Sequence, residues 1–431
     1  MRRPGQLIWT LCSLALIGAA CSSQPADTAV RTVNPKTPVP TVNPTARSDE
    51  GTVPTSTVPT SVDKIVSIDS GFPSAALPTG YGMPNILATD PSTSGVWFFA
   101  ESATSADVFH WDSASLSSWS VGNPVSDGLA AGIRNAITID QKHRVWVGVN
   151  STLIEFDPTT GQNRKVVLPE PPTSSAAQAH LPPILQNFFA IESISSDDSG
   201  HIAVAWSGAG AVTLFDSSTG QVSGSVALPV GTEATTLAYS TTNTLAIGLT
   251  DYTAGGLQDE VLLYYPDSAS SKLVSPVSSW SVSRAATGFV TGADGGSAVN
   301  LVSDDGVVTV LNIASEPERP IIGGNVVASA SYVFQETQTG LLVDPIGSGQ
   351  STAFTMPDIA CAEGSGGPPS PDTTNPPTTN PPTTNPPTTN PRRCGGRASV
   401  VAVDASGTIW YANPLPSPTI GSISAADYSG N

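Results

Sequence analysis

The body of the chain, from about Ile65 to Leu415, consists of short apolar runs separated by turn residues. Gly, Asp, Ser and Asn punctuate these runs, and long patterns with the 3.6-residue period of an amphipathic helix are almost absent. Short apolar runs with such boundaries are typical of β-strands joined by tight turns. The pattern therefore predicts an all-β fold.

A first half-motif recurs along this body: an apolar pair, an Asp, a turn and a second apolar strand. Asp-x-x-Gly indicates a tight turn, because the Asp side chain accepts backbone hydrogen bonds and Gly adopts positive φ without steric cost. Three copies share a six-residue step from the Asp into the next strand: Asp140 to Trp146, Asp198 to Val204, and Asp404 to Trp410. This constant step predicts structurally equivalent units.

A second half-motif is an apolar strand that ends in Asp, and its turns Asp157–Gly161 and Asp216–Gly220 are nearly identical. The two halves together form a unit of four strands that repeats about every 40–60 residues, as propeller blades do. The sequence predicts a β-propeller of seven blades with four antiparallel strands each; six and eight blades are the alternatives. We expect an N-terminal strand at Lys64–Ile68 to complete the last blade and close the ring, which removes free sheet edges.

The Asp-x-x-Gly-x-[Ile/Val]-Trp pattern, seen at Asp404–Trp410, resembles that of bacterial propellers of the NHL-repeat, streptogramin-lyase-like, gluconolactonase-like and YVTN types. The resemblance covers about 350 residues and implies a propeller architecture, but this architecture hosts many functions. Streptogramin-lyase-like enzymes use a His/Glu cluster with a divalent metal, and no repeat unit here pairs His with Glu in matching loops. Gluconolactonase-like enzymes bind a divalent ion through Glu, Asn and Asp on the central axis.

The N-terminus predicts export. Residues 1–20 carry two arginines, a short apolar run and small residues before Cys21, which is the layout of a signal peptide. The stretch Ile17–Ser23 resembles a bacterial lipobox, with Gly18 where Leu is usual. The resemblance implies that Cys21 becomes the lipid-carrying first residue on the outer face of a bacterial cytoplasmic membrane. An ordinary secretory signal cut near Ala20 is the alternative.

The rest of the chain divides by composition. Residues 21–62 are rich in Ser, Thr and Pro and predict a disordered tether. We assign residues 63–360 to propeller blades, 395–418 to the last blade and 419–431 to a C-terminal tail. After the N-terminus no stretch reaches the ~18 apolar residues of a spanning helix.

An insert at residues 361–394 interrupts the propeller. It contains Thr-Thr-Asn-Pro-Pro repeats from Thr373 onward and lies between Cys361 and Cys394. Pro-Pro pairs favour polyproline II and prevent strand ladders. In an exported protein the two cysteines predict a disulfide at the base of the insert. The insert is either a glycan-bearing or partner-binding stalk or a neutral low-complexity insertion.

Charge narrows the possible functions. The 431 residues carry a net charge of −18, and only 12% of them are charged. A nucleic-acid-binding protein needs a basic surface, so we expect no nucleic-acid partner. The acidity is spread over the repeats as turn Asp residues, whereas much of the Pro lies in the tether and the insert.

Several residues are candidates for chemistry. His143 and His201 follow motif Asp residues in neighbouring units, either as a base or metal ligand or as solvated turn residues. Glu101, Asn150 and Asp251 each follow an inner strand and are the best axial candidates for Ca²⁺ or Mg²⁺. The alternative is that they simply end strands and that no cofactor binds.

Other signals are weaker. The acidic pairs Asp197-Asp198, Asp259-Glu260 and Asp304-Asp305 are turn residues or, alternatively, a weak calcium site. Fingerprints of serine hydrolases, phosphate-binding loops and dinucleotide sites are absent. No catalytic set assembles, so we expect a lipid-anchored module that binds a protein or envelope polymer, with a role in cell-envelope assembly or lipid export. The alternative is a metal-dependent lactonase- or lyase-like enzyme. The low Lys content and the Thr/Pro tracts resemble those of actinobacterial exported proteins.

Overall fold

The computed structural model describes residues 41–42, 62–68, 71–90, 93–173, 179, 190–251, 258–275, 281–292, 298–312, 326–356, 359–360, 393–394, 400–413 and 418–429. Within these ranges it leaves out residues 125, 127–128, 130–134, 338–339 and 348–349. The predicted signal peptide, Cys21, Cys361 and almost all of the insert lie outside the described residues. Among the described residues, no helix is long and apolar enough to cross a membrane.

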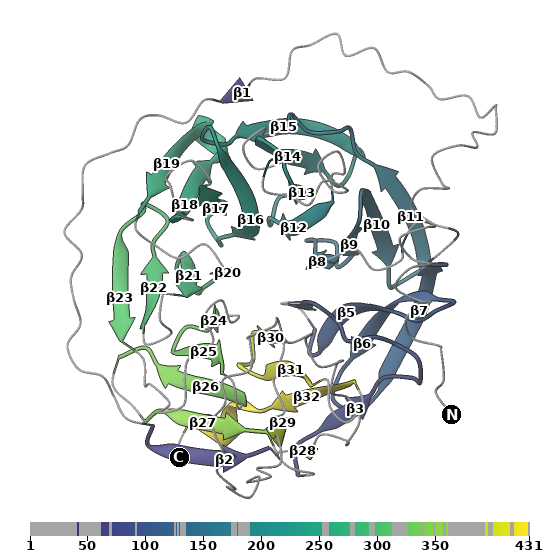
Figure 1. The fold of residues 1–431 in the computed structure, drawn as a ribbon, viewed down its shortest axis with the longest axis vertical. Helices are drawn as coiled ribbons and strands as arrows, with labels where there is room; N and C mark the ends of the chain where they lie inside the picture. The colour runs from purple at the N-terminus through teal and green to yellow at the C-terminus, as the bar shows by residue number, and fades with distance from the viewer. Residues whose placement is uncertain are drawn as a thin grey trace, which may run out of the picture. The chain divides into compact units, whose positions relative to one another are not determined.

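The described residues between 62 and 429 form a ring of seven sheets (Figure 1). Blade 1 holds β4 (Leu87–Thr89), β5 (Val96–Glu101), β6 (Ala106–Trp111) and β7 (Leu116–Gly122). Blade 2 holds β8 (Asn135–Ile139), β9 (Val145–Val149), β10 (Thr152–Asp157) and β11 (Gln162–Val167). Blade 3 holds β12 (Ile191–Ser196), β13 (His201–Trp206), β14 (Ala211–Asp216) and β15 (Gln221–Ala227).

The remaining blades follow the same order from the centre outward. Blade 4 holds β16 (Thr232–Tyr239), β17 (Leu245–Asp251), β18 (Gln258–Tyr265) and β19 (Ser270–Val274). Blade 5 holds β20 (Val282–Arg284), β21 (Phe289–Gly292), β22 (Ala298–Val302) and β23 (Val308–Asn312). Blade 6 holds β24 (Val326–Ala328), β25 (Tyr332–Glu336), β26 (Gly340–Pro345) and β27 (Thr352–Thr355). Blade 7 holds β30 (Val400–Val403), β31 (Ile409–Asn413), β32 (Thr419–Ile423) and the N-terminal β3 (Ser74–Ala76).

The ring is closed at its centre. Each innermost strand contacts the innermost strand of the next blade, in the cycle β4, β8, β12, β16, β20, β24, β30 and back to β4. This confirms the seven-bladed all-β propeller with antiparallel four-stranded blades. Closure by an N-terminal strand is also confirmed, but the strand is β3 rather than Lys64–Ile68.

The segment first expected to close the ring lies one blade away. β2 (Lys64–Ser67) runs parallel to β27 and adds a fifth strand to the outer edge of blade 6. β3 instead pairs antiparallel with β32, placing Ala75 opposite Ile420. Within the segment expected to be a tether, β1 (Thr41–Val42) pairs parallel with β15 at the outer edge of blade 3.

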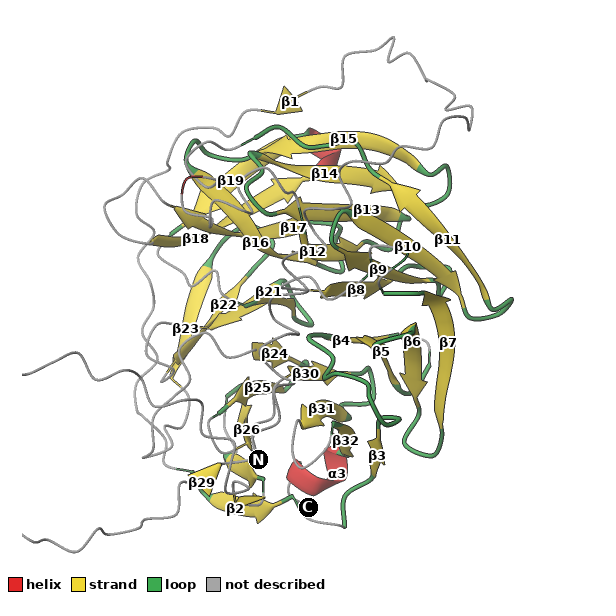
Figure 2. Ribbon diagram, turned by 45° about the vertical axis from the view of Figure 1, so that its right-hand side comes forward, coloured by secondary structure: helices red, strands yellow, loops and turns green. Residues whose placement is uncertain are grey.

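The last blade extends past residue 418, where the sequence suggested a tail. β32 supplies its third strand, and α3 (Ala425–Tyr428) follows directly (Figure 2). Tyr428 is buried among residues of blades 6 and 7, including Phe334 and Ile409. Between these blades, β28 (Ile359–Ala360) pairs with β29 (Arg393–Cys394), which brings the two ends of the insert together.

The core lies in the seams between blades. Each of seven hydrophobic clusters draws residues from two neighbouring blades. Because side chains alternate along a strand, one strand supplies both of its seams. In β9, Val145 and Val147 face blade 1, whereas Trp146 faces blade 3. This two-sided burial explains why the strands read as short continuous apolar runs.

Candidate functional site

The two faces of the ring differ in the length of their loops. Because neighbouring strands are antiparallel, the turns between the first and second and the third and fourth strands of a blade share one face, here called the turn face. Its first-to-second turns are short, from 329–331 in blade 6 to 90–95 in blade 1. The opposite connection face carries the blade-to-blade segments, which range from 228–231 to 168–190 and 356–399.

Buried Asp residues organise the first turns on the turn face. Oδ1 of Asp140 accepts hydrogen bonds from the backbone N–H of Lys142 (2.8 Å) and Arg144 (3.1 Å). Its Oδ2 accepts a 2.9 Å bond from the indole N–H of Trp146. In blade 7, Asp404 accepts the matching bond from Trp410 at 3.0 Å. The six-residue step in the sequence is therefore an Asp–Trp hydrogen bond that ties the turn to the core.

In blade 3 the equivalent residue is Asp197, not Asp198. The Asp197 N–H donates to the carbonyl of His201, as the Asp140 N–H does to that of Arg144. Asp197 is 2% exposed and its Oδ2 bonds His201 Nδ1 at 2.8 Å. Asp198 is exposed and forms a 3.3 Å ion pair with Arg284 of blade 5. The acidic pair Asp197-Asp198 thus consists of one structural and one solvated carboxylate.

His143 and His201 are not in equivalent positions. His143 has φ 60° at the third position after Asp140, where blades 3 and 7 have Gly200 and Gly407 at φ 95° and 82°. Its Nδ1 lies 3.0 Å from a carboxylate oxygen of Asp90 in blade 1. Asp90 is 3% exposed, whereas the His143 side chain is 52% exposed. Each histidine is thus oriented by a buried carboxylate, His143 across a seam and His201 within its own turn.

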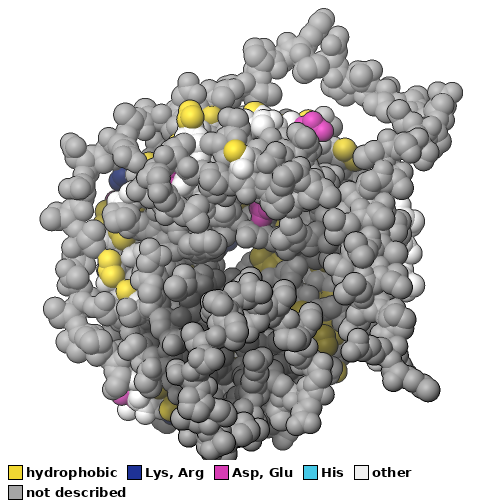
Figure 3. Space-filling view, in the orientation of Figure 1, with side chains coloured by type: hydrophobic (Ala, Val, Ile, Leu, Met, Phe, Trp, Pro, Cys, Tyr) yellow, Lys and Arg dark blue, Asp and Glu magenta, His cyan; other side chains and the backbone are white. Residues whose placement is uncertain are grey.

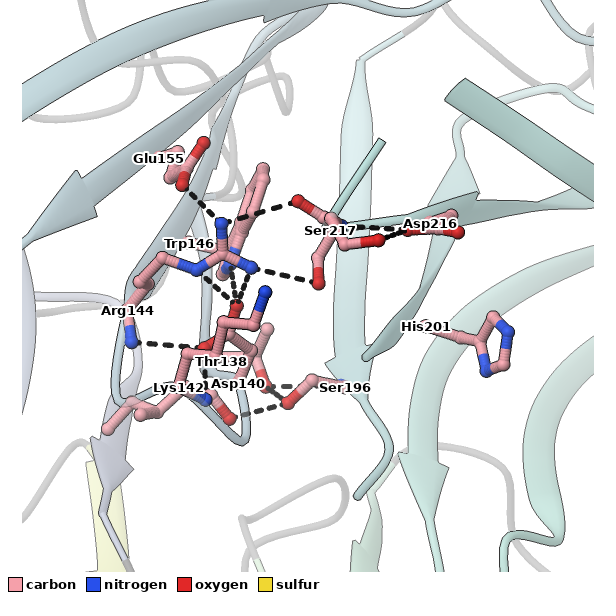
Figure 4. A network of polar contacts seen from close by, with 12 residues as sticks. Thr138, Asp140, Lys142, Arg144, Trp146, Glu155, Ser196, His201, Asp216 and Ser217 are labelled. Carbon is pink, nitrogen blue, oxygen red and sulfur yellow. Dashed lines mark hydrogen bonds and ion pairs between the residues drawn. The ribbon is translucent and has the colours of Figure 1, made fainter. Parts of the chain in front are cut away.

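A polar network closes the seam between blades 2 and 3 (Figure 4). The Arg144 guanidinium donates to Asp140 Oδ2, to Glu155 Oε1 at 2.5 Å and to Ser217 Oγ at 2.9 Å. Arg164 donates to the other oxygen of Glu155. The Arg144 side chain is 13% exposed, and its Cζ atom lies 5.3 Å from the centroid of the Trp146 ring. Sequence reasoning missed Arg144 and Glu155, because their partners are brought together by the fold.

The innermost strands are also joined by hydroxyl groups. The hydroxyl oxygens of Thr138 and Ser196 lie 3.0 Å apart across the same seam. The Ser196 hydroxyl also donates a hydrogen bond to the carbonyl of Ile139. Ser195 Oγ accepts the backbone N–H of Tyr239 in blade 4 at 3.0 Å. These bonds add polar contacts between blades 2 and 3 and between blades 3 and 4, in addition to the apolar seams.

The second half-motif forms Asp-capped turns between third and fourth strands. Asp216 Oδ1 accepts the backbone N–H of Ser218 at 2.7 Å and of Thr219 at 3.0 Å. The Ser218 hydroxyl and these backbone bonds favour the carboxylate and lower the pKa of Asp216 to about 2. Backbone N–H bonds likewise lower the pKa values of Asp112 and Asp157.

The axial candidates lie one strand out from the centre. Glu101 and Asp251 are the last residues of β5 and β17, and Asn150 follows β9; each of these is the second strand of its blade. They belong to blades 1, 4 and 2, on the connection face. Among the described residues, no three His, Cys, Asp or Glu side chains lie close enough together to hold a metal ion. The metal role of Glu101, Asn150 and Asp251 stays a prediction.

Two exposed valines mark the connection face of blades 2 and 3. Val167 at the end of β11 is 85% exposed, and Val230 is 95% exposed. Val230 lies in a turn in which the Thr232 N–H donates to the carbonyl of Pro229, with Gly231 at φ 87°. Positive φ at this position is typical of a type II turn. The turn therefore holds an apolar side chain in water on a fixed backbone.

The backbone under these valines is well anchored. The Gly210 N–H donates to the carbonyl of Pro172, and the Leu228 N–H donates to that of Gly210. Thr173 and Ala209 form an isolated antiparallel bridge. The Gly208 N–H donates to Glu233 Oε1 of blade 4 at 2.8 Å. The start of the blade 2 to blade 3 connection thus lies along the connection face of blade 3.

Comparisons with known proteins support the fold alone. No family model matches the chain, and no curated protein matches it in sequence. The WD40 domain of Neurospora crassa Pan2 is similar in structure, with a TM-score of 0.50 and 11% identity over 84% of this chain and 98% of that one. A chain of the mitotic checkpoint complex also matches, with a TM-score of 0.47 and 13% identity over 89% of this chain and 99% of that one. Kuenenia stuttgartiensis hydrazine synthase matches with a TM-score of 0.43 and 11% identity over 62% of this chain and 78% of that one. The match to the Pan2 domain shows that the fold of this chain is similar to that of a WD40 propeller.

Proposed function

We propose that this chain is an exported propeller, anchored to the outer face of a bacterial membrane through Cys21, that binds a protein or an envelope polymer with its connection face. It serves cell-envelope assembly or lipid export by binding rather than by catalysis. We also propose that the propeller is of the NHL, YVTN or streptogramin-lyase-like type. The anchor rests on the lipobox-like stretch before Cys21.

The exposed valines Val167 and Val230 carry the binding proposal. Fully solvated apolar side chains on a rigid backbone favour association, because the backbone entropy of ordering them is already lost in the free protein. They stand on the face with the long connections, and binding residues are commonly found on loops held by a rigid scaffold. The turn face, by contrast, consists of short turns whose Asp residues are occupied by their own backbone.

The test is affinity capture from detergent-solubilised membranes after chemical crosslinking, with the wild-type chain and with Val167→Asp/Val230→Asp. We expect a stoichiometric envelope component with the wild type and its loss in the double variant. The matched control is Thr241→Asp, an exposed position on the turn face, which should retain the component. Equal recovery with both variants would contradict binding at the connection face.

The anchor is tested separately. Cys21→Ala should move the protein from the membrane fraction to the soluble or secreted fraction and abolish incorporation of labelled fatty acid. An unchanged membrane fraction for this variant would refute the anchor without touching the binding proposal.

A further inference from the structure

The outer strand of each blade has one edge that its own blade does not pair. Such an edge presents unpaired N–H and C=O groups and is a template for another strand. In this chain the N-terminal segment covers two of these edges, β2 on β27 and β1 on β15. The blades therefore accept an added strand on their outer edges.

Most of the other edges carry a recognisable protection against pairing. β11 contains Arg164 and Lys165, and β19 contains Lys272. β3 is three residues long and lies between Pro73 and Pro78. At β7 the carbonyl of Ser120 accepts a hydrogen bond from the Asn163 side chain. Charges, Pro and short length are the usual ways to block edge pairing.

β23 has none of these features. Its sequence is Val-Thr-Val-Leu-Asn, five residues without a charge or Pro, and Val307 just before it is 53% exposed. Val308, Thr309, Val310 and Leu311 are all partly exposed, so neither side of the strand is fully covered by the described residues. Hydrophobic side chains gather at the rim of the ring near β23 (Figure 3).

The hairpin geometry shows which groups of β23 point outward. The Ser303 N–H donates to the carbonyl of Val307, so this pair is hydrogen-bonded. Antiparallel pairs alternate between hydrogen-bonded and non-hydrogen-bonded. With Leu301 opposite Thr309 and Asn300 opposite Val310, the Thr309 and Leu311 groups point to β22. The N–H and C=O of Val308, Val310 and Asn312 then point to the outer edge, which no other strand among the described residues pairs.

These outward groups are self-complementary under a two-fold axis at Val310. In an antiparallel pair, Val310 faces the partner's Val310, and Val308 faces the partner's Asn312. All three positions then form hydrogen-bonded pairs. A two-fold contact uses the same surface on both copies, and β-branched residues form favourable cross-strand pairs.

We propose that β23 is a homodimerisation edge, at which two copies join their fifth blades into one eight-stranded antiparallel sheet. The absence of charge in β23 allows this despite the net charge of −18, because no like charges oppose each other in the ladder. Repulsion between the acidic rings opposes the contact at longer range. Added salt should therefore strengthen the dimer, since it screens exposed charges.

Sedimentation equilibrium over a range of protein concentrations tests the contact. We expect a reversible monomer–dimer equilibrium for the purified full chain. Val310→Lys should raise the dimer dissociation constant at least about tenfold, because it places two lysines face to face. Ser118→Lys on the edge strand β7 adds the same charge at an exposed position and should leave the constant unchanged. Circular dichroism checks that both variants fold.

Oxidative crosslinking tests the register. Val310→Cys should form a disulfide-linked dimer, since paired Cα atoms of a hydrogen-bonded pair lie ~5.5 Å apart, within disulfide reach. Val308→Cys should form no more disulfide-linked dimer than the unsubstituted chain does. The reason is that the two copies of residue 308 would lie ~13 Å apart. A chain that stays monomeric at all concentrations, a dimer unaffected by Val310→Lys, or equal crosslinking at 308 and 310 would overturn the proposal.

Discussion

Nη2 of Arg144 donates a 2.9 Å hydrogen bond to Oγ of Ser217 across the seam between blades 2 and 3. The same guanidinium binds Asp140, whose side chain is fully buried, and Glu155, whose side chain is 11% exposed. One arginine thus satisfies two carboxylates and connects two blades. A buried charge network of this kind is costly to break because the remaining charges lose their partner.

Replacing Arg144 should destabilise the protein strongly. Arg144→Met keeps much of the stem but removes the charge, which leaves Asp140 without the Arg144 cation and Glu155 with Arg164 alone. We expect a loss of about 3–5 kcal/mol in the free energy of unfolding. Arg164→Met is the control, because its side chain is 50% exposed. It should cost no more than about 1 kcal/mol. Urea unfolding at pH 7 compares the two, and equal losses would contradict the role of the seam.

The backbone of His143 gives a second expectation. A non-Gly residue at φ 60° is strained, and glycine relieves this strain. His143→Gly and His143→Ala both lose the contact with Asp90, so their difference isolates the backbone term. We expect the Ala variant to be less stable than the Gly variant by about 1 kcal/mol. Thermal unfolding measures this difference, and an Ala variant as stable as the Gly variant would refute it.

The sequence contained enough to predict the ring but not its details. The Asp–Trp step is local, so Asp140 and Trp146 could be found by spacing alone. In blade 3 the adjacent Asp197 and Asp198 made two registers possible, and the backbone hydrogen bond and burial of Asp197 decide between them. The closing strand β3 has three residues, Ser-Ala-Ala, which carry little β signal. Its place depends on pairing with β32, far away in sequence.

The candidate residues follow the same division. Local turn chemistry was readable, which is why Asp157 and Asp216 could be recognised as turn residues. Contacts across seams were not, since Arg144 meets Ser217 and His143 meets Asp90 only after the ring closes. The strand order within a blade was also unreadable, so Glu101 and Asp251 appeared to follow innermost strands. In the structure those strands are second in their blades.

Acid should weaken the Asp-capped turns. The pKa of Asp216 is about 2 in the folded protein, below its ordinary value of 3.8. Because the folded pKa is depressed, this carboxylate stabilises the fold fully above the ordinary pKa, and the contribution is lost as the pH falls from about 4 to 2. Ser218→Ala removes one hydroxyl donor and should raise the pKa. Carbon-detected NMR titration of the Asp216 carboxyl measures it, and an unchanged pKa in Ser218→Ala would contradict this cause.

β28 pairs with β29 at the base of the insert, so the effect of the predicted Cys361–Cys394 disulfide on stability can be tested. Cys394 lies opposite Ile359, two residues before Cys361 in the sequence, so the ladder brings the ends of the insert together. A Cys361–Cys394 bond would close this loop and restrict the unfolded chain, which the loop-entropy model values at about 3–4 kcal/mol.

Peptide mapping without reductant should recover the linked pair. Cys361→Ser/Cys394→Ser should lower the unfolding midpoint, and reductant should lower the wild type to the same value. A free thiol at Cys361 in the untreated protein would refute the disulfide. A wild type insensitive to reductant would show that the β28–β29 ladder alone holds the base of the insert.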